Sequence, residues 1–137
     1  MSGLFLADRA SHVQATLFDA LSSDQIIISQ LGDPARLYDD VPPDPIYPYL
    51  TFGEIRSTDV SGDGAAQSNH QISLHIWSRY TGRAEVMELM RHIERVVQAV
   101  PELRVVPVYL DIFQAADGRT RHGLLRLSIT STSGTEL

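Results

Sequence analysis

The chain has 137 residues, 43% hydrophobic and 20% charged, a composition that predicts one globular domain and excludes a disordered, collagenous or disulfide-stapled chain. It has no cysteine, which excludes disulfides and zinc–thiolate sites, and no apolar run long enough for a signal peptide or a membrane span. The formal charge is −6, with 17 acidic residues against 11 basic ones, none of them lysine, so the chain repels a phosphate backbone.

Two helices are predicted in the first part of the chain. Apolar residues at three- and four-residue steps predict a helix over Ser11–Leu21, with the serine at its start as the N-cap. A short second helix is predicted at 26–31, ending at Gly32, although its β-branched residues have low helix propensity. Five prolines between residues 33 and 49 then predict a stiff, extended connector with at most a short strand at Leu37–Tyr38.

The middle of the chain predicts two strands separated by a long loop. Strand-forming residues fill Tyr49–Ile55, and apolar and polar residues alternate over Gln71–Trp77. Between them, residues 56–69 show no periodicity and almost no apolar anchors. A loop of this length in a compact domain is typically functional or disordered.

The last part of the chain predicts a long helix and a hairpin. The helix covers Gly82–Val100, where seven apolar residues form one stripe, and Pro101 ends it. Strands follow at Arg104–Gln114 and Arg121–Thr132, joined by a turn at Asp117-Gly118.

Alternation in the first strand of this hairpin predicts one apolar face. That face holds Val106, Val108, Leu110 and Ile112. Pro107 lacks a donor for the strand ladder, which places it at an edge or a bulge.

The order of these elements predicts a single α+β domain over residues 1–137, with a mostly antiparallel sheet, a long helix packed on one face and an N-terminal helix. With one face given to the long helix, the other face still carries Ser73, His75, Trp77, Tyr109, Asp111, Phe113, Leu124 and Arg126. A mixture of aromatic residues and arginine is typical of protein–protein contacts. The candidate subunit interface is His75, Trp77, Tyr109, Phe113 and Arg126. The alternative is that the first helix or the proline-rich connector covers this face.

No motif in the sequence points to catalysis. The five histidines lack helical metal-ligand spacing, and the acidic loops lack the spacing of a calcium site. There is no Gly-x-Ser-x-Gly, no phosphate-binding loop and no dinucleotide fingerprint. Three arginines near the hairpin, Arg119, Arg121 and Arg126, form a weak nucleic-acid signal. The sequence therefore predicts a structural or binding protein with no catalytic residues, no cofactor and no metal site.

Five sequence blocks, taken in their order along the chain, resemble a known family. These blocks are residues 38–43 (Tyr-Asp-Asp-Val-Pro-Pro), 48–54, 74–79, 82–85 and 117–123. Together they resemble the small tail-completion proteins encoded in the head–tail joining cassettes of long-tailed phages, prophages and gene transfer agents. The resemblance covers about Val13 to Thr130.

The resemblance implies a tail terminator: an α+β domain that forms a hexameric ring on the last ring of the tail tube, stops tube growth and offers a surface to the head connector. The implied partners are copies of itself, the tail tube protein and the connector or stopper protein, with DNA only as passing cargo and no membrane. The implied location is the tail neck of a virion or phage-like particle, reached by assembly in the bacterial cytoplasm. No catalytic residue is carried over from the family.

Three features of the sequence fit this role independently. A ring needs one patch that meets a different patch on the next copy, and the uncovered sheet face could supply one of them. The loop over 56–69 has the length to reach the tail tube or a neighbouring subunit, with Asp59, Val60, Asp63 and Asn69 as candidate contacts. The net charge of −6 would let DNA slide through a lumen. Two alternatives stay open, another neck component such as a stopper or adaptor, and a small-molecule enzyme domain, which would show an enclosed pocket with converging polar groups.

Overall fold

The computed structural model describes residues 5–62 and 66–133 of the chain. Within these residues it has three helices and five strands, in the order α1 (Leu6–Ser23), α2 (Gln25–Leu31), β1 (Leu37–Tyr38), β2 (Tyr49–Asp59), β3 (Ala66–Ser78), α3 (Ala84–Gln98), β4 (Leu103–Gln114) and β5 (Arg121–Ser133).

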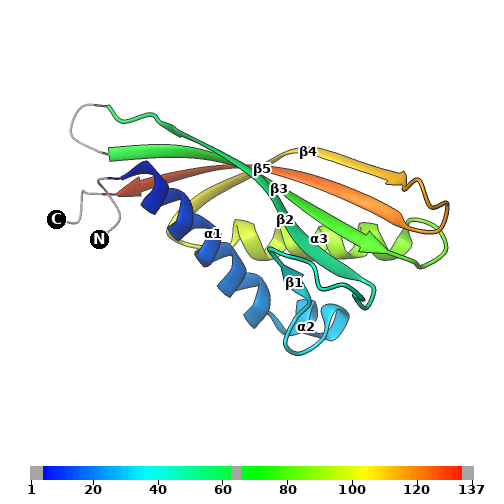
Figure 1. The fold of residues 1–137 in the computed structure, drawn as a ribbon. Helices are drawn as coiled ribbons and strands as arrows, with labels where there is room; N and C mark the ends of the chain where they lie inside the picture. Colours follow the sequence, from blue (N-terminus) through cyan, green and yellow to red (C-terminus); the bar gives the residue numbers. More distant parts are fainter. Residues whose placement is uncertain (1–4, 63–65, 134–137) are drawn as a thin grey trace.

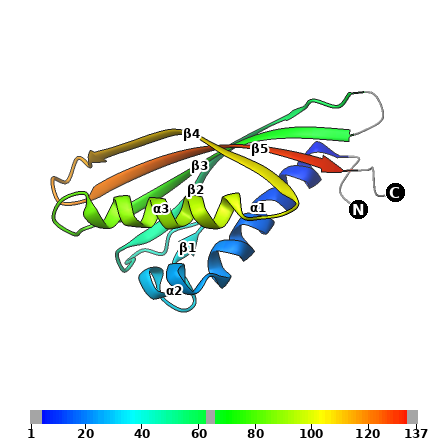
Figure 2. The ribbon, with the colours of Figure 1, turned by 180° about the vertical axis from the view of Figure 1, so that it is seen from behind.

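All five strands form one sheet, with the spatial order β1-β2-β3-β5-β4. Strand β1 runs parallel to β2, and every other neighbouring pair is antiparallel. Helices α1 and α3 both lie on one side of this twisted sheet, and the other side carries no helix (Figures 1 and 2). The predicted α+β class, with a mostly antiparallel sheet, is confirmed, and α1 does not cover the second face. Among the described residues, no helix has the length and apolar character needed to cross a membrane.

Helix α1 begins five residues before its predicted start, so the prediction of Ser11 as N-cap is wrong. The residue before the helix is Phe5, which makes no capping hydrogen bond through its side chain. The buried side chains of α1 lie four residues apart, at Arg9, Val13, Leu17 and Leu21. Because the first of these is an arginine, a pattern built on apolar residues places the start of the helix too late.

Helix α2 forms in spite of its β-branched residues because its N-terminus is capped. The Asp24 carboxylate accepts hydrogen bonds from the backbone amides of Ile26 and Ile27, at 3.2 and 3.1 Å. The same carboxylate is 2.9 Å from Arg95 of α3, an ion pair that ties the two helices together. This arginine lowers the pKa of Asp24. As predicted, Gly32 follows the helix, with φ at +91°.

The proline-rich connector between α2 and β2 has the predicted form. Its one strand in the described chain is β1, whose two residues pair with Leu50 and Thr51 of β2. Arg36 donates from Nε to the carbonyl oxygen of Pro48 at 3.0 Å, which holds the two ends of the connector together.

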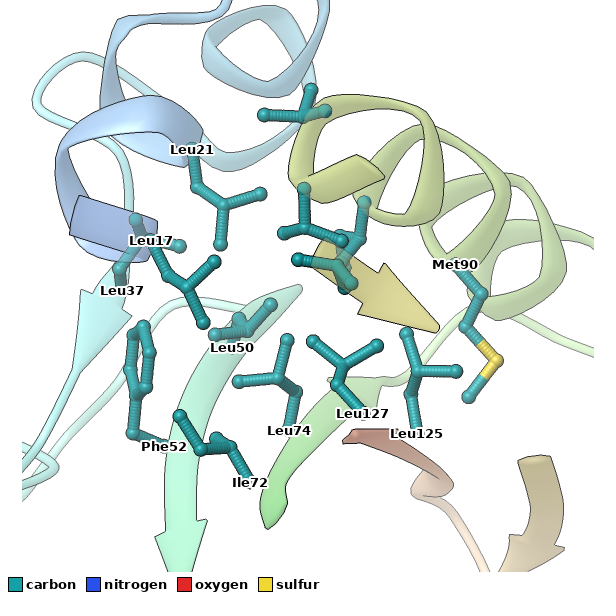
Figure 3. Packing of buried hydrophobic residues seen from close by; sticks show 14 of the residues in the cluster. Leu17, Leu21, Leu37, Leu50, Phe52, Ile72, Leu74, Met90, Leu125 and Leu127 are labelled. Atoms are coloured by element: carbon teal, nitrogen blue, oxygen red, sulfur yellow. The ribbon is translucent and has the colours of Figure 1, made fainter. Parts of the chain in front are cut away.

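The hydrophobic core lies between the sheet and its helices, and Figure 3 shows side chains from α1, α3 and the central strands meeting there. Helix α3 covers most of the predicted range and buries six residues of its apolar stripe. The helix approaches β5 closely at Gly123, where an added Cβ would lie 2.6 Å from Cγ1 of Val86 and 2.8 Å from Cε of Met90. The fully buried members of the core include Leu17, Leu50, Leu74, Ile76, Ile93, Leu125 and Leu127.

The predicted loop over 56–69 is wrong over most of its length. Strand β2 continues to Asp59 and β3 begins at Ala66, so most of the described part of this segment is strand. The positions that face the helices here are polar, which removes the apolar alternation expected of a strand. His70 is fully buried with both ring nitrogens hydrogen-bonded, to Oγ of Ser57 at 2.7 Å and of Ser68 at 2.8 Å.

The alternation of apolar residues in β4 predicts one apolar face, but the strand does not keep it. The register with β5 shifts between Pro107 and Tyr109, so a bulge changes the phase of the strand. Val106 lies on the helix-free side, while Leu110 and Ile112 pair with inward positions of β5. The prediction that Pro107 lies at an edge or a bulge is confirmed, because Pro107 lies on the edge strand and directly before the bulge.

Candidate protein interface on the open sheet face

A row of rings crosses the helix-free face of the sheet from one edge to the other. Tyr49 of β2 is paired with Trp77 of β3, Trp77 with His122 of β5, and His122 with Phe113 of β4. Side chains directly opposite each other on one sheet face lie within contact distance, so this register builds a continuous row. We call these four residues, together with Tyr38, Tyr47 and His75, the aromatic band.

The rings of the aromatic band stack on one another. The Trp77 and His122 centroids are 3.8 Å apart with an interplanar angle of 21°, and the Phe113 and His122 centroids are 4.6 Å apart. At the β1 edge the Tyr49 centroid lies 6.2 Å from that of Trp77 and 5.1 Å from that of Tyr47. Burial raises the pKa of Tyr49 to about 12. The band is therefore a packed layer of rings in place of a second set of helices.

Two histidines form the centre of the band. Nδ1 of His75 lies 2.7 Å from Nε2 of His122, so one ring donates and the other accepts. Burial, followed by the neighbouring His75, lowers the pKa of His122 to about 4. Burial also lowers the pKa of His75. Both rings are consequently neutral at pH 7, the state in which a single N–H···N hydrogen bond can join them.

Arginine side chains lie over rings at both ends of this face. The Arg79 guanidinium is 4.3 Å from the Tyr47 centroid, and the Arg126 guanidinium is 4.9 Å from that of Tyr109. Arg126 also lines a polar hollow of about 300 Å³ with Glu54 and Arg56. The backbone amide of Glu54 lowers the pKa of its own carboxyl group. This part of the face offers charged groups of both signs next to exposed rings.

The structure places all five predicted interface residues on the helix-free side, but with different accessibility. Tyr109, Phe113 and Arg126 are exposed, whereas His75 and Trp77 are half-buried within the stack. The first three are free to touch another molecule, and the other two support them. The connector reaches only the β1 edge, through Tyr47, so the alternative that it covers this face does not hold.

The candidate contacts in the β2–β3 hairpin, by contrast, are largely engaged within the chain. The Asp59 carboxylate lies 3.0 Å from the guanidinium of Arg9, and Asn69 donates from Nδ2 to Oγ of Ser128 at 3.0 Å. The backbone amide of Ser61, together with Arg9, lowers the pKa of Asp59. Val60 remains exposed at the end of the hairpin. Asp63 lies outside the described residues.

Sequence reasoning missed Tyr49 and His122 as parts of this face. Tyr49 was assigned only as the first residue of a strand, and His122 was counted among histidines without metal-ligand spacing. The signal that finds them is the pairing register, because residues opposite Trp77 on both neighbouring strands carry rings. Among residues 5–62 and 66–133, no three His, Asp or Glu side chains gather as metal ligands.

The fold is similar to that of a chain in the solved virion of a native gene transfer agent (GTA) particle, with a TM-score of 0.73 and 20% sequence identity over 88% of this chain and 94% of that chain. At this identity the likeness concerns the fold. No curated protein matches the sequence. The family model described as "Tail completion protein gp17" matches residues 15–132, which confirms the resemblance found in the sequence. The chain therefore belongs to the tail completion protein gp17 family and is a structural component of a phage-type virion tail.

Proposed function

We propose that this tail completion protein is a tail terminator. Six copies form a ring on the last ring of the tail tube, stop its elongation and present their opposite side to the head connector or stopper protein. The observation that carries the proposal is the sheet face left without helices, which ends in exposed Tyr109 and Phe113. A virion protein with such a face has a surface suited to another protein chain.

The ring requires two different patches on each copy, because identical patches close a dimer and not a ring. One patch is the exposed part of the open face, Tyr109, Phe113 and Arg126. Aromatic residues and arginine carry much of the binding energy in protein interfaces. His75 and Trp77 hold this patch rigid from behind, which reduces the entropy lost on assembly.

The end of the β2–β3 hairpin is the proposed contact with the tail tube or a neighbouring copy. Asp59 and Asn69 fix its shape through Arg9 and Ser128, and exposed Val60 provides the apolar contact. Asp63 belongs to the same proposed contact.

The proposed role involves no catalysis and no cofactor. DNA passes through the ring without being held, because a chain with a net charge of −6 repels the phosphate backbone. The charge argument depends on carboxylates lining the passage. A lumen lined by arginines would contradict it.

The role is tested by native mass spectrometry of the chain, alone and with the tail tube protein of the same particle, together with electron microscopy of particles that lack the chain. A terminator gives a six-copy ring bound to tube protein and, when absent, overlong tails. Tails of normal length that fail to join heads would instead identify a stopper or adaptor. Absence of any association with tube protein would contradict the proposal.

Two matched variants locate the contact surface. Phe113 and Met87 are each 41% exposed, but Phe113 lies on the open face and Met87 on α3. We expect Phe113→Ser to lower the yield of tube-bound ring by about tenfold or more, the size expected for an interface anchor. Met87→Ser should leave the yield unchanged. Equal losses in both variants would remove the open face from the interface.

A further inference from the structure

We propose that the sheets of neighbouring copies join edge to edge, with β4 of one copy adding antiparallel to the free part of β2, residues 55–59, of the next. This inference rests on the ring proposed above and names the second patch that the ring needs. The occupant of each edge is therefore a second copy of this chain.

The first edge is β4, the last strand of the sheet. In the described chain, no backbone hydrogen bond from Arg104–Gln114 leads to any element except β5, so its outer side is open. Five large apolar side chains on it are exposed: Val106, Val108, Tyr109, Leu110 and Phe113. Proteins protect such an edge with lysines, prolines or bulges; this chain has no lysine, and on β4 Pro107 and the bulge after it interrupt the edge at one point. On either side of that point, the free backbone groups of β4 are a template for another strand.

The second edge is the part of β2 that β1 leaves uncovered. Strand β1 pairs only with Leu50 and Thr51, and the remainder of β2 bonds to β3 on one side alone. Beside this free edge a groove of about 450 Å³ runs between α1 and β2. Ala10, Ala15, Phe18 and Ile55 are among its lining residues. Small side chains on α1 thus leave room for the side chains of an added strand.

The two edges have the directions that an antiparallel pair needs, and they lie at the same height along the sheet. Because β2–β3, β3–β5 and β5–β4 are all antiparallel, β4 and β2 run in opposite directions, so a neighbour displaced sideways presents an antiparallel partner. The pairings Thr58–Asn69, Asn69–Thr130 and Thr130–Arg104 put Thr58 and Arg104 at one level. The same pairings put Asp111 and Ile112 level with Thr51 and Leu50, where β1 already lies beside β2, so residues 104–107 of β4 pair with β2 and the rest of β4 passes along the outer side of β1.

Charges at one end of the sheet support the same arrangement. Asp39, Asp40 and Asp44 are exposed in the connector beside β1, while Arg83 and Arg121 line a pocket of about 390 Å³ beside the end of β4. Within the described residues none of these five side chains forms an ion pair. Joining β4 to the next β2 brings the acidic connector to the arginine pocket. A two-fold pairing of β4 with β4 would leave the connector unpartnered.

The aromatic band also continues across this junction. Phe113 ends the band at the β4 edge, and Tyr38 with Tyr49 ends it at the β1 edge, where their ring centroids are 5.8 Å apart. Edge pairing brings the Phe113 ring of one copy beside the tyrosines of the next. The rings would then form one belt around the whole assembly.

Cysteine cross-linking tests the pairing directly, because the natural chain has no cysteine. Thr58 and Arg104 are exposed on the same face, and three strand spacings of about 4.8 Å separate them within one molecule, too far for a disulfide. We expect Thr58→Cys/Arg104→Cys, oxidised in the presence of tail tube protein, to give a ladder of up to six linked copies. The pair shifted by one step on the same face is Thr58→Cys/Val106→Cys.

The controls separate the pairing from the ring itself. Thr58→Cys/Met87→Cys and each single variant should give at least about tenfold less linked product, since their cysteines do not meet. A six-copy ring that is seen by native mass spectrometry but gives no ladder with either pair overturns the edge pairing and leaves the terminator role standing. Strong linkage of Val106→Cys alone indicates a two-fold β4 contact and also overturns it. Absence of any ring or tube binding contradicts the proposed function instead.

A charge exchange tests the connector contact. Arg83→Asp/Arg121→Asp should lower the ring yield by roughly tenfold, because like charges then face each other across the junction. Adding Asp39→Arg/Asp40→Arg should restore at least half of the yield. Thermal melting of each variant checks that the monomer still folds. A loss that the second pair of changes does not restore contradicts this contact.

Discussion

The two faces of the sheet hold different chemistry and serve different ends. The helix-covered face is aliphatic, and Leu74, Ile76, Leu125 and Leu127 on it are fully buried. Apart from buried Tyr49, the open face carries rings, histidines and arginine at intermediate or high exposure. Burial of apolar area is the main source of folding free energy, so the covered face carries the stability of the monomer. The rings of the open face stay partly exposed to water, and they can be buried further when copies of the chain assemble.

The largest effect is expected from a cavity on the covered face. Leu74 is fully buried, and Leu74→Ala should lower the free energy of unfolding by about 3 kcal/mol, through lost burial and the space left behind. Leu124→Ala, one strand away on the open face, should cost about 1 kcal/mol or less because its side chain is only half-buried. Urea denaturation measures both values. Equal losses would show that the open face also carries the stability.

The next largest effects are expected at two glycines, one packed against the helix side of the sheet and one against the open face. An added Cβ at Gly123 meets Val86 and Met90 of α3, whereas one at Gly53 meets Nε2 of His75 at 2.6 Å on the open face. We expect Gly123→Ala to cost about 2 kcal/mol, since a packed helix must shift. Gly53→Ala should cost less, because it displaces one half-buried imidazole, with a close contact to the Ser73 carbonyl oxygen at 3.1 Å, and moves no packed helix.

The readout for these two variants is the emission of Trp77, the one tryptophan of the chain. Gly53→Ala displaces the ring of His75, whose centroid is 6.1 Å from that of Trp77, and should change the emission of the native state. Gly123→Ala should lower the melting temperature with little change in that emission. The reverse pattern would contradict the packing assigned to the two faces.

The open face should also make stability depend on pH. The pKa of His122 is about 4 in the fold, below the ordinary value of 6.5. Between these values the unfolded chain binds more protons, so the free energy of unfolding falls as pH drops from 7 to 4. The loss should be about 1–2 kcal/mol, allowing for solvent around a half-buried ring.

Thermal unfolding at pH 7 and pH 4.5 measures this effect. His122→Gln should flatten the pH dependence, since the most shifted group is gone. His12→Gln, on the exposed side of α1, should behave like the natural chain. An undiminished pH dependence in His122→Gln would place the responsible group elsewhere.

The smallest effect on the monomer is expected at the exposed edge of the open face. Tyr109 is 46% exposed, and Tyr109→Ser should change the free energy of unfolding by about 0.5 kcal/mol or less. The same variant should lose most of its ring formation with tail tube protein. Full assembly by Tyr109→Ser would show that stability and contact are not divided between the two faces.

The sequence predicted the elements whose core positions are apolar. The long helix, the Gln71–Trp77 strand and the open face carrying Trp77 and Phe113 all followed from periodicity. The pattern failed where polar groups take positions on the helix side of the sheet. His70 with its two serines, and Arg9 with Asp59, occupy inward positions that a hydrophobic alternation treats as solvent.

The sequence alone predicted only part of the aromatic band. Alternation shows which side of its own strand a ring occupies, but not which residue of the next strand lies opposite. The bulges between Phe52 and Ile55 and between Pro107 and Tyr109 set those pairings. Gly53 and Pro107 indicate where a bulge can occur, but they do not determine which residues pair on either side of it.

One strand spans the molecule from the hairpin end to the aromatic band. Strand β3 pairs with β5 without a register shift from Ala66 to Ser78, a length of about 44 Å. Arg9 of α1 donates to the carbonyl of Gln67 near its start, and Ser78 at its end donates to Glu85 of α3. An extended backbone is already close to its full length and hardly stretches under tension. Strand β3 is therefore a stiff connection. A force applied at its first residues reaches the rings and the long helix at its other end without passing through a flexible loop.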